Sequence, residues 1–394
     1  MNRRHFLRIG TGFPFALACT MHDTTARDTS LPRYDRTLIL IHLKGGNDGL
    51  NTVIPYTNSL YRQYRPTLAI SRDRTLPISE TQAFHPSLEG LMPLWQAGEL
   101  AVVQGIGYED TRLAHYRSLE IIYTGSNADE YLDTGWLSRQ FIAYPASERV
   151  WLDGIAFGPL DVREADPMGP FRGNQTRFAS LDHANEWLVK YDISACQGRL
   201  TTAAKAVAVK PAQIREQHQT TIAFPNTDFG TQLRAAVELI DSKVNVPVIH
   251  LCLDANDNGV NGTFDTHKNQ LRLHGNILKQ LGDGFLLLKA ALSTRGHWQN
   301  TLVVTYDEYG RRVKENEIGG TEHGAANTHF VAGGNVRGGL YGQAPRLEHL
   351  NYYGCIEPVL DYRRLYATIL ENWWGTNSTH VLRGHYQPLA IIRA

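Results

Sequence analysis

The sequence predicts an α/β fold, in which a doubly wound, mostly parallel sheet carries helices on both faces. Short apolar runs without polar alternation recur along the chain, which is typical of parallel strands buried on both sides. Segments with helical periodicity lie between these runs. Loops rich in acidic residues, histidine and glycine follow the runs, as expected where ligands bind at the carboxyl ends of parallel strands.

The predicted strands and helices alternate along the chain. The first strand, 37–43 (TLILIHL), ends at the glycines of the loop GGNDG. Further strands are predicted at 100–106, 247–253, 301–305 and 328–332. The clearest helix is 268–293, whose apolar residues recur every three or four positions on one face. Two more helices are predicted at 228–242 and 361–374.

The expected organisation is one large domain behind a short leader. A chain of 394 residues can bury a large core without disulfide or metal staples. Residues 31–394 contain no linker rich in Pro, Gly or Ser, and we expect them to form a single domain. The segment of about 158–246 is poorer in strand patterns and richer in helical ones, so we expect a helical insertion or cap there.

The first residues resemble a targeting signal. Arg3 and Arg4 stand just ahead of Phe-Leu and a short, weakly apolar stretch, as in a twin-arginine export signal, which would occupy residues 1–30 together with a short linker. We therefore expect a periplasmic or secreted protein. Lipid attachment at Cys19 is an alternative with a looser motif, and a cytosolic amphipathic start is the other.

Charge and composition exclude several classes of protein. The 39 Lys and Arg residues balance the 39 Asp and Glu residues, whereas a nucleic-acid binder would carry a basic excess. No apolar run after residue 20 approaches the about 18 residues of a spanning helix, so we expect no transmembrane segment in the mature chain. The cysteines at 196, 252 and 355 lack metal-ligand spacing, and we expect none to be catalytic.

The polar loops supply carboxylates and imidazoles that could meet at one edge of the sheet. The candidate metal ligands are Asp48, Asp265, His267, Glu308 and His323. A mixed oxygen and imidazole set suits Zn, Mn or Fe better than Ca or Mg. We therefore expect one or two divalent transition-metal ions, which could polarise a phosphoryl or sulfuryl oxygen and hold the attacking oxygen in line.

Each candidate ligand also has a purely structural explanation. Asp48 could stabilise the tight turn of GGNDG, and Asp265 could cap the helix that follows it. Glu308 could form an ordinary ion pair with a neighbouring arginine, and His323 could be a turn residue within GTEHG. For the five residues taken together we favour metal binding, because four loops at the ends of predicted strands all carry an acidic residue or a histidine.

Several short motifs occur in a defined order: GGNDGLNT at 45–52, HP at 85–86, AHYR at 114–117, FDTH at 264–267, DEYGR at 307–311, GGTEHG at 319–324 and GGLYG at 338–342. Together they resemble an exported bacterial family known as domain of unknown function 1501, which looks like a branch of the alkaline phosphatase and sulfatase superfamily. The resemblance spans about residues 36–345. It implies an alkaline phosphatase-like α/β fold with divalent metals at the strand ends.

The resemblance also implies roles for single residues. Asp48 would match the aspartate ligand after the first strand, Asp265 and His267 one metal pair, Glu308 the acid after a late strand, and His323 the last histidine. Within the same motifs His115 and Arg311 are the candidate catalytic residues, with Arg311 neutralising an anionic substrate.

One departure from the family pattern concerns the nucleophile. The family typically has Ser-His-Phe where this chain has Ala114-His115-Tyr116, so the alcohol is absent. A covalent intermediate needs an activated hydroxyl, and Thr52 and Ser118 are weak substitutes. A metal-bound hydroxide could attack directly instead.

Two functions of different classes follow from these observations. The first is an exported metal-dependent hydrolase that acts on a small anionic phosphate or sulfate ester. The second is a catalytically inactive envelope protein of the same fold, which binds a cell-envelope component or scaffolds a partner. The acidic and histidine set favours the first function, and Ala114 favours the second.

Overall fold

The apolar runs of the sequence form one central sheet. The structure is a computed structural model that describes residues 31–158, 169–173, 176–181, 220–242, 244–254 and 263–393. The strands of this sheet are β1 (Thr37–Leu43), β5 (Leu100–Gly107), β6 (Gly154–Phe157), β7 (Phe178–Leu181), β8 (Val248–Leu253), β9 (Thr301–Tyr306), β12 (Asn327–Ala332), β13 (Gly339–Gly342) and β14 (Leu360–Asp361). Their order is β13-β5-β12-β9-β1-β8-β6-β7, with β14 paired to β5. The five predicted strands are confirmed as β1, β5, β8, β9 and β12.

Every strand of this described sheet except β12 runs in the same direction. β1 is parallel to β8 and β9, β6 is parallel to β7 and β8, and β13 and β14 are parallel to β5. β12 is antiparallel to both of its neighbours, β5 and β9. The prediction of a mostly parallel sheet is confirmed. The amino end of β12 therefore lies at the same edge as the carboxyl ends of the other strands, and we call this the site edge.

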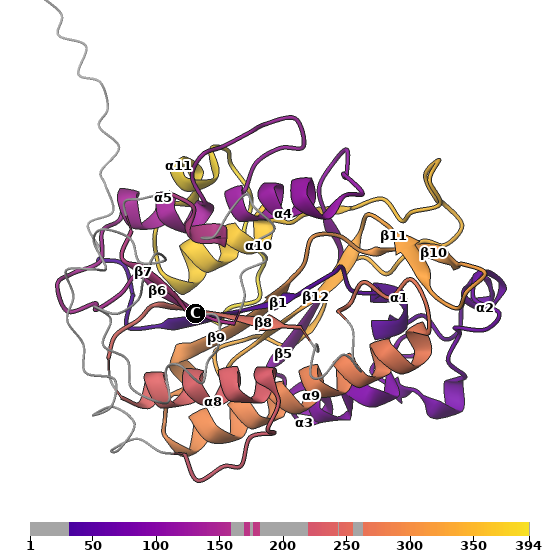
Figure 1. Cartoon of the computed structure of the whole chain (residues 1–394), viewed down its shortest axis with the longest axis horizontal. Coiled ribbons are helices and arrows are strands. Elements are labelled where there is room, and N and C mark those ends of the chain that lie inside the picture. The colour runs from indigo at the N-terminus through magenta and orange to yellow at the C-terminus, as the bar shows by residue number, and fades with distance from the viewer. Residues whose placement is uncertain are drawn as a thin grey trace, which may run out of the picture. The chain divides into compact units, whose positions relative to one another are not determined.

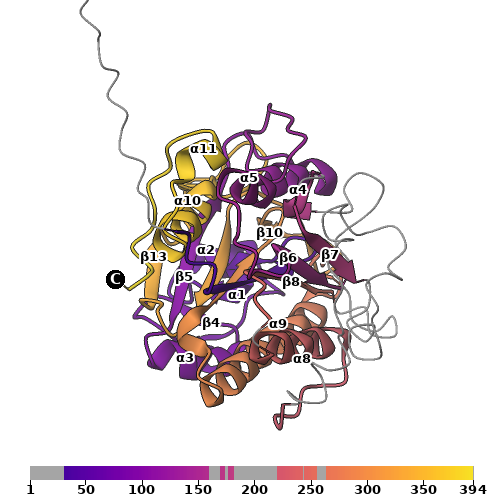
Figure 2. The ribbon, with the colours of Figure 1, turned by 90° about the vertical axis from the view of Figure 1, so that its left-hand side faces the viewer.

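Helices cover both faces of the sheet, as predicted (Figures 1 and 2). One face carries α4 (His115–Thr124), α5 (Trp136–Ala143), α10 (Arg363–Ala367), the π-helical turn η8 (Thr368–Trp373) and α11 (Ser378–Leu382). The other face carries α3 (Met92–Gln96), α8 (Asp228–Asp241) and α9 (Gln270–Thr294). The predicted helices at 228–242, 268–293 and 361–374 correspond to α8, α9 and the α10 to η8 run.

The core divides into two layers because successive side chains of a strand point to opposite faces. In β1, Ile39 and Ile41 pack with α8 and α9, whereas Leu38 and Leu40 pack with the helices of the opposite face. The apolar stripe of α9 is fully buried: Leu278, Leu281, Phe285, Leu288 and Leu292. Burying each such side chain contributes about 1.5–3 kcal/mol to stability. Because the helix is stabilised by this one face, its apolar residues recur every three or four positions, and that spacing was enough to predict it.

Smaller elements pack around the loops of the site edge. These are α1 (Gly49–Thr52), β2 (Val53–Ile54), α2 (Ser59–Tyr64), β3 (Leu76–Pro77), β4 (Ala83–Phe84), β10 (Arg311–Glu315) and β11 (Thr321–His323). Short 3-10 turns elsewhere in the described chain are Arg72–Arg74, Pro86–Leu91, Gly169–Phe171 and, directly before β9, Trp298–Asn300. A third apolar cluster, which includes Leu50, Tyr61 and Val313, joins α1 and α2 to β10. This cluster holds the loops after β1 and β9 against each other.

The described parts of segment 158–246 join the main sheet and its helices. β7 extends the sheet beyond β6, and α8 packs on α9. The rest of that segment, residues 1–30, Cys19 and Cys196 lie outside the described residues, so the predicted cap and export signal stay predictions. Cys252 and Cys355 are buried thiols. Among the described helices, none is long and apolar enough to cross a membrane.

Candidate functional site

The loop after β1 turns sharply at two glycines. Gly45 and Gly46 have φ angles of +107° and +80°, which residues with a side chain rarely adopt. A Cβ atom on Gly46 would lie 2.7 Å from ring atoms of Tyr309. The GGNDG motif is therefore required by backbone geometry and by close packing. It places Asp48 at the start of α1.

The Asp48 carboxylate is fully buried and is neutralised by an arginine. Arg65 donates a hydrogen bond to each of its oxygens, at 2.9 Å to Oδ1, and Gln270 donates a third. Burial acts to raise the pKa of Asp48, but the Arg65 guanidinium outweighs burial and lowers it. The structure thus commits Asp48 to an internal ion pair and does not bring it into the group of side chains described next.

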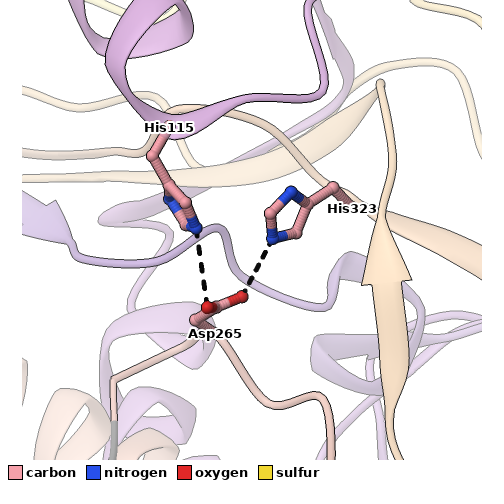
Figure 3. A group of neighbouring side chains, drawn as sticks. All are labelled: His115, Asp265 and His323. Atoms are coloured by element: carbon pink, nitrogen blue, oxygen red, sulfur yellow. Dashed lines mark hydrogen bonds and ion pairs between the residues drawn. The ribbon is translucent and has the colours of Figure 1, made fainter.

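Asp265 and three histidines converge at the site edge. These four residues form a candidate metal site, and we call them the metal cluster. The Nε2 atoms of His267 and His323 lie 2.9 and 3.1 Å from Oδ1 of Asp265. Nε2 of His115 lies 3.5 Å from Oδ2 of Asp265. Figure 3 shows His115, from the start of α4, and His323, from the end of β11, pointing at Asp265. About a third of each of the side chains of His115 and His267 is exposed, so solvent reaches the cluster.

The far nitrogen of each imidazole in the metal cluster faces an acceptor. Nδ1 of His115 lies 2.9 Å from Oε1 of Glu308, and Nδ1 of His267 lies 3.1 Å from Oε2 of Glu322. Nδ1 of His323 lies 2.9 Å from the carbonyl oxygen of Leu113. A proton on each Nδ1 satisfies these contacts, so each Nε2 can offer a lone pair on the side of Asp265 once it has given up its own proton. Metal-binding histidines are oriented in this way by carboxylates and backbone carbonyls.

The donor set fits a divalent transition metal. Ligand atoms of His115, Asp265 and His323 all lie within 4.8 Å of one another, and Nε2 of His267 is 3.1 Å from Nε2 of His323. Three imidazoles and one carboxylate suit Zn, Mn or Fe. Burial acts to lower the pKa of His115, but hydrogen bonds with Asp265 and Glu308 raise it to about 9. An ion must therefore displace a proton from this ring.

Glu308 lies behind His115 and not beside Asp265. Its buried carboxylate accepts hydrogen bonds from the backbone N–H of Gly45 at 3.0 Å and from His115, and it lies 3.2 Å from Nε2 of His42. Burial acts to raise the pKa of Glu308, but the bonds from His115 and His42 hold it below its usual value. In this arrangement Glu308 orients a candidate ligand, so its predicted role as a ligand needs revision.

Arg311 binds the Asp265 carboxylate of the metal cluster. Its guanidinium is fully buried and donates to the carbonyl oxygens of Gly46, Thr321 and Phe264 at 2.8, 3.1 and 3.2 Å, and also to that of Gly45. It donates a further bond of 2.5 Å to Oδ1 of Asp265. With these partners the guanidinium cannot reach a substrate, contrary to the expectation from the sequence. It fixes the Asp265 carboxylate instead.

None of the candidate alcohols occupies a place suited to a nucleophile. The Thr52 hydroxyl is buried and hydrogen bonded to Asn47 and to the backbone of Asp48. The Ser118 hydroxyl is bonded to Tyr108 and to a backbone carbonyl. Ala114 is the exposed N-cap residue of α4, and its methyl group makes no capping hydrogen bond. A serine at 114 would be a helix cap next to a metal-cluster histidine.

Replacing Ala114 by serine is expected to stabilise the protein. A serine hydroxyl at an N-cap accepts a bond from an otherwise unpaired backbone N–H, which contributes about 0.5–2 kcal/mol. Urea unfolding should show a higher midpoint for Ala114→Ser, with Ala97→Ser at the C-cap of α3 as the control that gains nothing. A gain in ester turnover without a gain in stability would contradict the capping role.

Several residues of the site could not be found from the motifs alone. Arg65 lies seventeen positions after Asp48, in a segment without a distinctive pattern. His42 lies within the apolar run of β1, so the sequence pattern marks it as a strand residue only. Its ring stacks on that of Tyr306 at a centroid distance of 4.9 Å. Glu322, within GGTEHG, was visible as an acid but not as the partner of His267. The Tyr309 ring packs on His323 with a centroid distance of 4.6 Å.

Comparison with known protein families identifies the family to which the chain belongs. The family described as Protein of unknown function (DUF1501) matches residues 174–386. The chain belongs to this family. The matched region of this DUF1501 member contains the FDTH, DEYGR and GGTEHG motifs, and with them Asp265, His267 and His323. The resemblance inferred from the motifs is confirmed.

Solved structures with a similar arrangement have low sequence identity to this DUF1501 chain. A protein in the alkaline phosphatase superfamily from Vibrio parahaemolyticus is 13% identical, with a TM-score of 0.45 over 90% of this chain and 70% of that chain. The lipoteichoic acid synthase LtaP from Listeria monocytogenes is 10% identical, with a TM-score of 0.45 over 89% and 75%. The PsFucS1 sulfatase from Pseudoalteromonas sp. is 11% identical, with a TM-score of 0.40 over 90% and 70%. No curated protein matches the chain in sequence.

Proposed function

We propose that this DUF1501 protein is a metal-dependent hydrolase of phosphate or sulfate esters that works with one transition-metal ion in the metal cluster. The observation that carries the proposal is the convergence of three Nε2 atoms on Asp265, with an acceptor behind every imidazole. Such a set orients lone pairs toward one point. It lies at the edge of the sheet where ligands bind in open α/β folds.

One ion is favoured over two because the remaining acids are already neutralised. Asp48 is paired with Arg65, and Glu308 is bonded to His115, His42 and Gly45. A second ion would have to displace a buried guanidinium from Asp48, which would leave that cation without its partner at a cost of several kcal/mol. The Arg65 guanidinium therefore supplies the positive charge beside Asp48 that a second metal ion would otherwise supply.

The residues of the chain prepare the site in distinct ways. An ion held by His115, Asp265, His267 and His323 would act as a Lewis acid toward the ester and lower the pKa of a coordinated water. Glu308 and Arg311 fix the ligands His115 and Asp265 in position. Because position 114 is alanine and the hydroxyls of Thr52 and Ser118 are hydrogen bonded to other partners, the proposed route is direct attack by water without a covalent intermediate.

Metal content and turnover test the proposal together. Elemental analysis of protein purified in metal-replete buffer should give about one ion per chain. The same protein should hydrolyse an aryl phosphate or an aryl sulfate, and a chelator should stop the reaction reversibly. Well under one ion per chain, or a full ion without turnover of either ester, would overturn the proposal.

A second candidate function is an envelope protein that keeps the ion but does not turn over a substrate. Ala114 favours it, because the alcohol that the family usually has at this place is missing. The capping position of Ala114 weakens that argument, since a helix cap can be lost without loss of chemistry. A full ion with no ester turnover is the result that would select this function.

We also propose that the protein is exported through a twin-arginine signal. The motivation is the pair Arg3 and Arg4 ahead of Phe-Leu. Replacing both arginines with lysine is expected to trap the precursor in the cytoplasm, because twin-arginine signals are read by a receptor and not by charge alone. Cell fractionation measures the outcome, and the same replacement at Arg72 and Arg74 serves as the control. Undiminished export of the Arg3→Lys/Arg4→Lys variant would contradict the signal.

A further inference from the structure

Two histidines lie fully buried inside the central sheet, among apolar residues of their own strands. They are His42 of β1 and His250 of β8. In the described chain, Nδ1 of each ring has no hydrogen-bond partner. A buried polar atom without a partner destabilises the fold. The presence of each histidine therefore needs an explanation from what its other ring nitrogen binds.

The other ring nitrogen of His42 binds Glu308. Side chains alternate along β1, so His42 shares the face of Leu38 and Leu40, which is the face that α4 covers. Its Nε2 lies 3.2 Å from Oε2 of Glu308. Because a carboxylate can only accept, the hydrogen bond places a proton on Nε2 of His42. Stacking on Tyr306, at a centroid distance of 4.9 Å and an interplanar angle of 8°, fixes the plane of the ring.

The two oxygens of Glu308 have different partners. Oε1 accepts from Nδ1 of His115 at 2.9 Å and from the backbone N–H of Gly45 at 3.0 Å. Oε2 accepts from His42, and in the described chain the two histidines are the ion-pair partners of this carboxylate. The last torsion of a glutamate side chain has broad preferences, so the carboxylate plane is fixed by its partners. Removing the donor at Oε2 therefore loosens the oxygen that orients His115.

We propose that His42 is a positioning residue of the metal cluster, which sets the affinity for the ion by fixing Glu308 and through it the direction of the His115 ring. This proposal rests on the metal site of the proposed function and does not require hydrolysis. His42 acts at a distance, because no hydrogen bond, ion pair or ring contact joins it to the four cluster residues in the described chain. His250 differs in its partner, since its Nε2 lies 2.6 Å from the Tyr306 hydroxyl.

Two substitutions separate the ring of His42 from its hydrogen bond. His42→Phe keeps a ring that can stack on Tyr306 but has no donor, whereas His42→Gln keeps an N–H donor near the place of Nε2 but has no ring. The Kd for Zn²⁺, measured by competition with a chromogenic chelator, is expected to rise about 10- to 100-fold in His42→Phe. It should stay close to the wild-type value in His42→Gln. A purely structural role of the buried ring predicts the opposite order.

His250→Phe is the matched control, because His250 is equally buried on the adjacent strand but does not contact Glu308. This variant should keep the wild-type Kd for Zn²⁺. Unfolding temperatures measured in chelator compare the stability of the metal-free folds. They show whether a change in Kd follows the loss of the donor or a general loss of stability.

A double-mutant cycle tests the route through His115. In a His115→Ala background, His42→Phe should change the Kd for Zn²⁺ by less than about twofold, because residues that act through one another are not additive. Wild-type affinity in His42→Phe, equal weakening in His42→Gln and His42→Phe, or additive effects in the cycle would overturn the proposal. Wild-type protein that binds no zinc would overturn it together with the hydrolase proposal. One bound zinc without ester turnover would overturn the hydrolase proposal alone, and the variants would still decide the role of His42.

Discussion

The His323→Ala variant is expected to lose stoichiometric metal and the stability that metal supplies. His323 contributes Nε2 at 3.1 Å from Asp265 and from His267, so its removal breaks the centre of the metal cluster. An ion present at 100 times its Kd stabilises the folded state by about 2.7 kcal/mol. The wild-type protein should therefore unfold at a higher temperature with metal than with chelator, and this difference should vanish in the variant.

His349→Ala is the matched control for this experiment. His349 is exposed and lies outside the metal cluster, so the variant should bind one ion and keep the metal-dependent shift in unfolding temperature. Elemental analysis and thermal scans with and without chelator give both readouts on the same samples. Full metal content in His323→Ala would show that the cluster is not the metal site.

Replacing Glu308 by glutamine is expected to weaken metal binding and ester turnover by about 10- to 100-fold. The carboxylate accepts bonds from His115 and from the backbone N–H of Gly45 on the same oxygen, and it lies beside His42. Glutamine has no charge, so the bonds from His115 and Gly45 become weaker neutral ones, and its amide puts a donor in place of the oxygen that lies beside His42. The His115 ring is then held less firmly toward Asp265.

Metal titration distinguishes this positioning role from general damage to the fold. Excess metal should restore part of the turnover of Glu308→Gln, because a misoriented ligand weakens the site without removing it. Glu317→Gln, an exposed acid in the turn between β10 and β11, should match the wild-type protein. Wild-type affinity and turnover in Glu308→Gln would contradict the role assigned to the carboxylate.

Local patterns in the chain were sufficient for the fold class and for five of the nine strands of the main sheet. β1 and α9 were visible because buried strands and amphipathic helices leave periodic signatures that do not depend on distant residues. The composition of the loops, with acids, histidines and glycines after successive strands, was sufficient to point to the site edge. The direction of β12 was not visible, since an apolar run has no polarity and its antiparallel pairing depends on β5 and β9.

The composition of the metal cluster depended on contacts between residues far apart in the chain. Asp48 fits a metal ligand or a turn residue equally well in its motif, and it is the Arg65 guanidinium, held by the packing of α1 and α2 on β10, that commits it to an ion pair. His115 lies about 150 residues before Asp265, and the fold brings the two together because α4 begins at the same edge of the sheet where β8 ends. Whether a residue can be a metal ligand depends on its distance from the other ligands and on the direction of its side chain. Residue type and order along the chain specify neither that distance nor that direction.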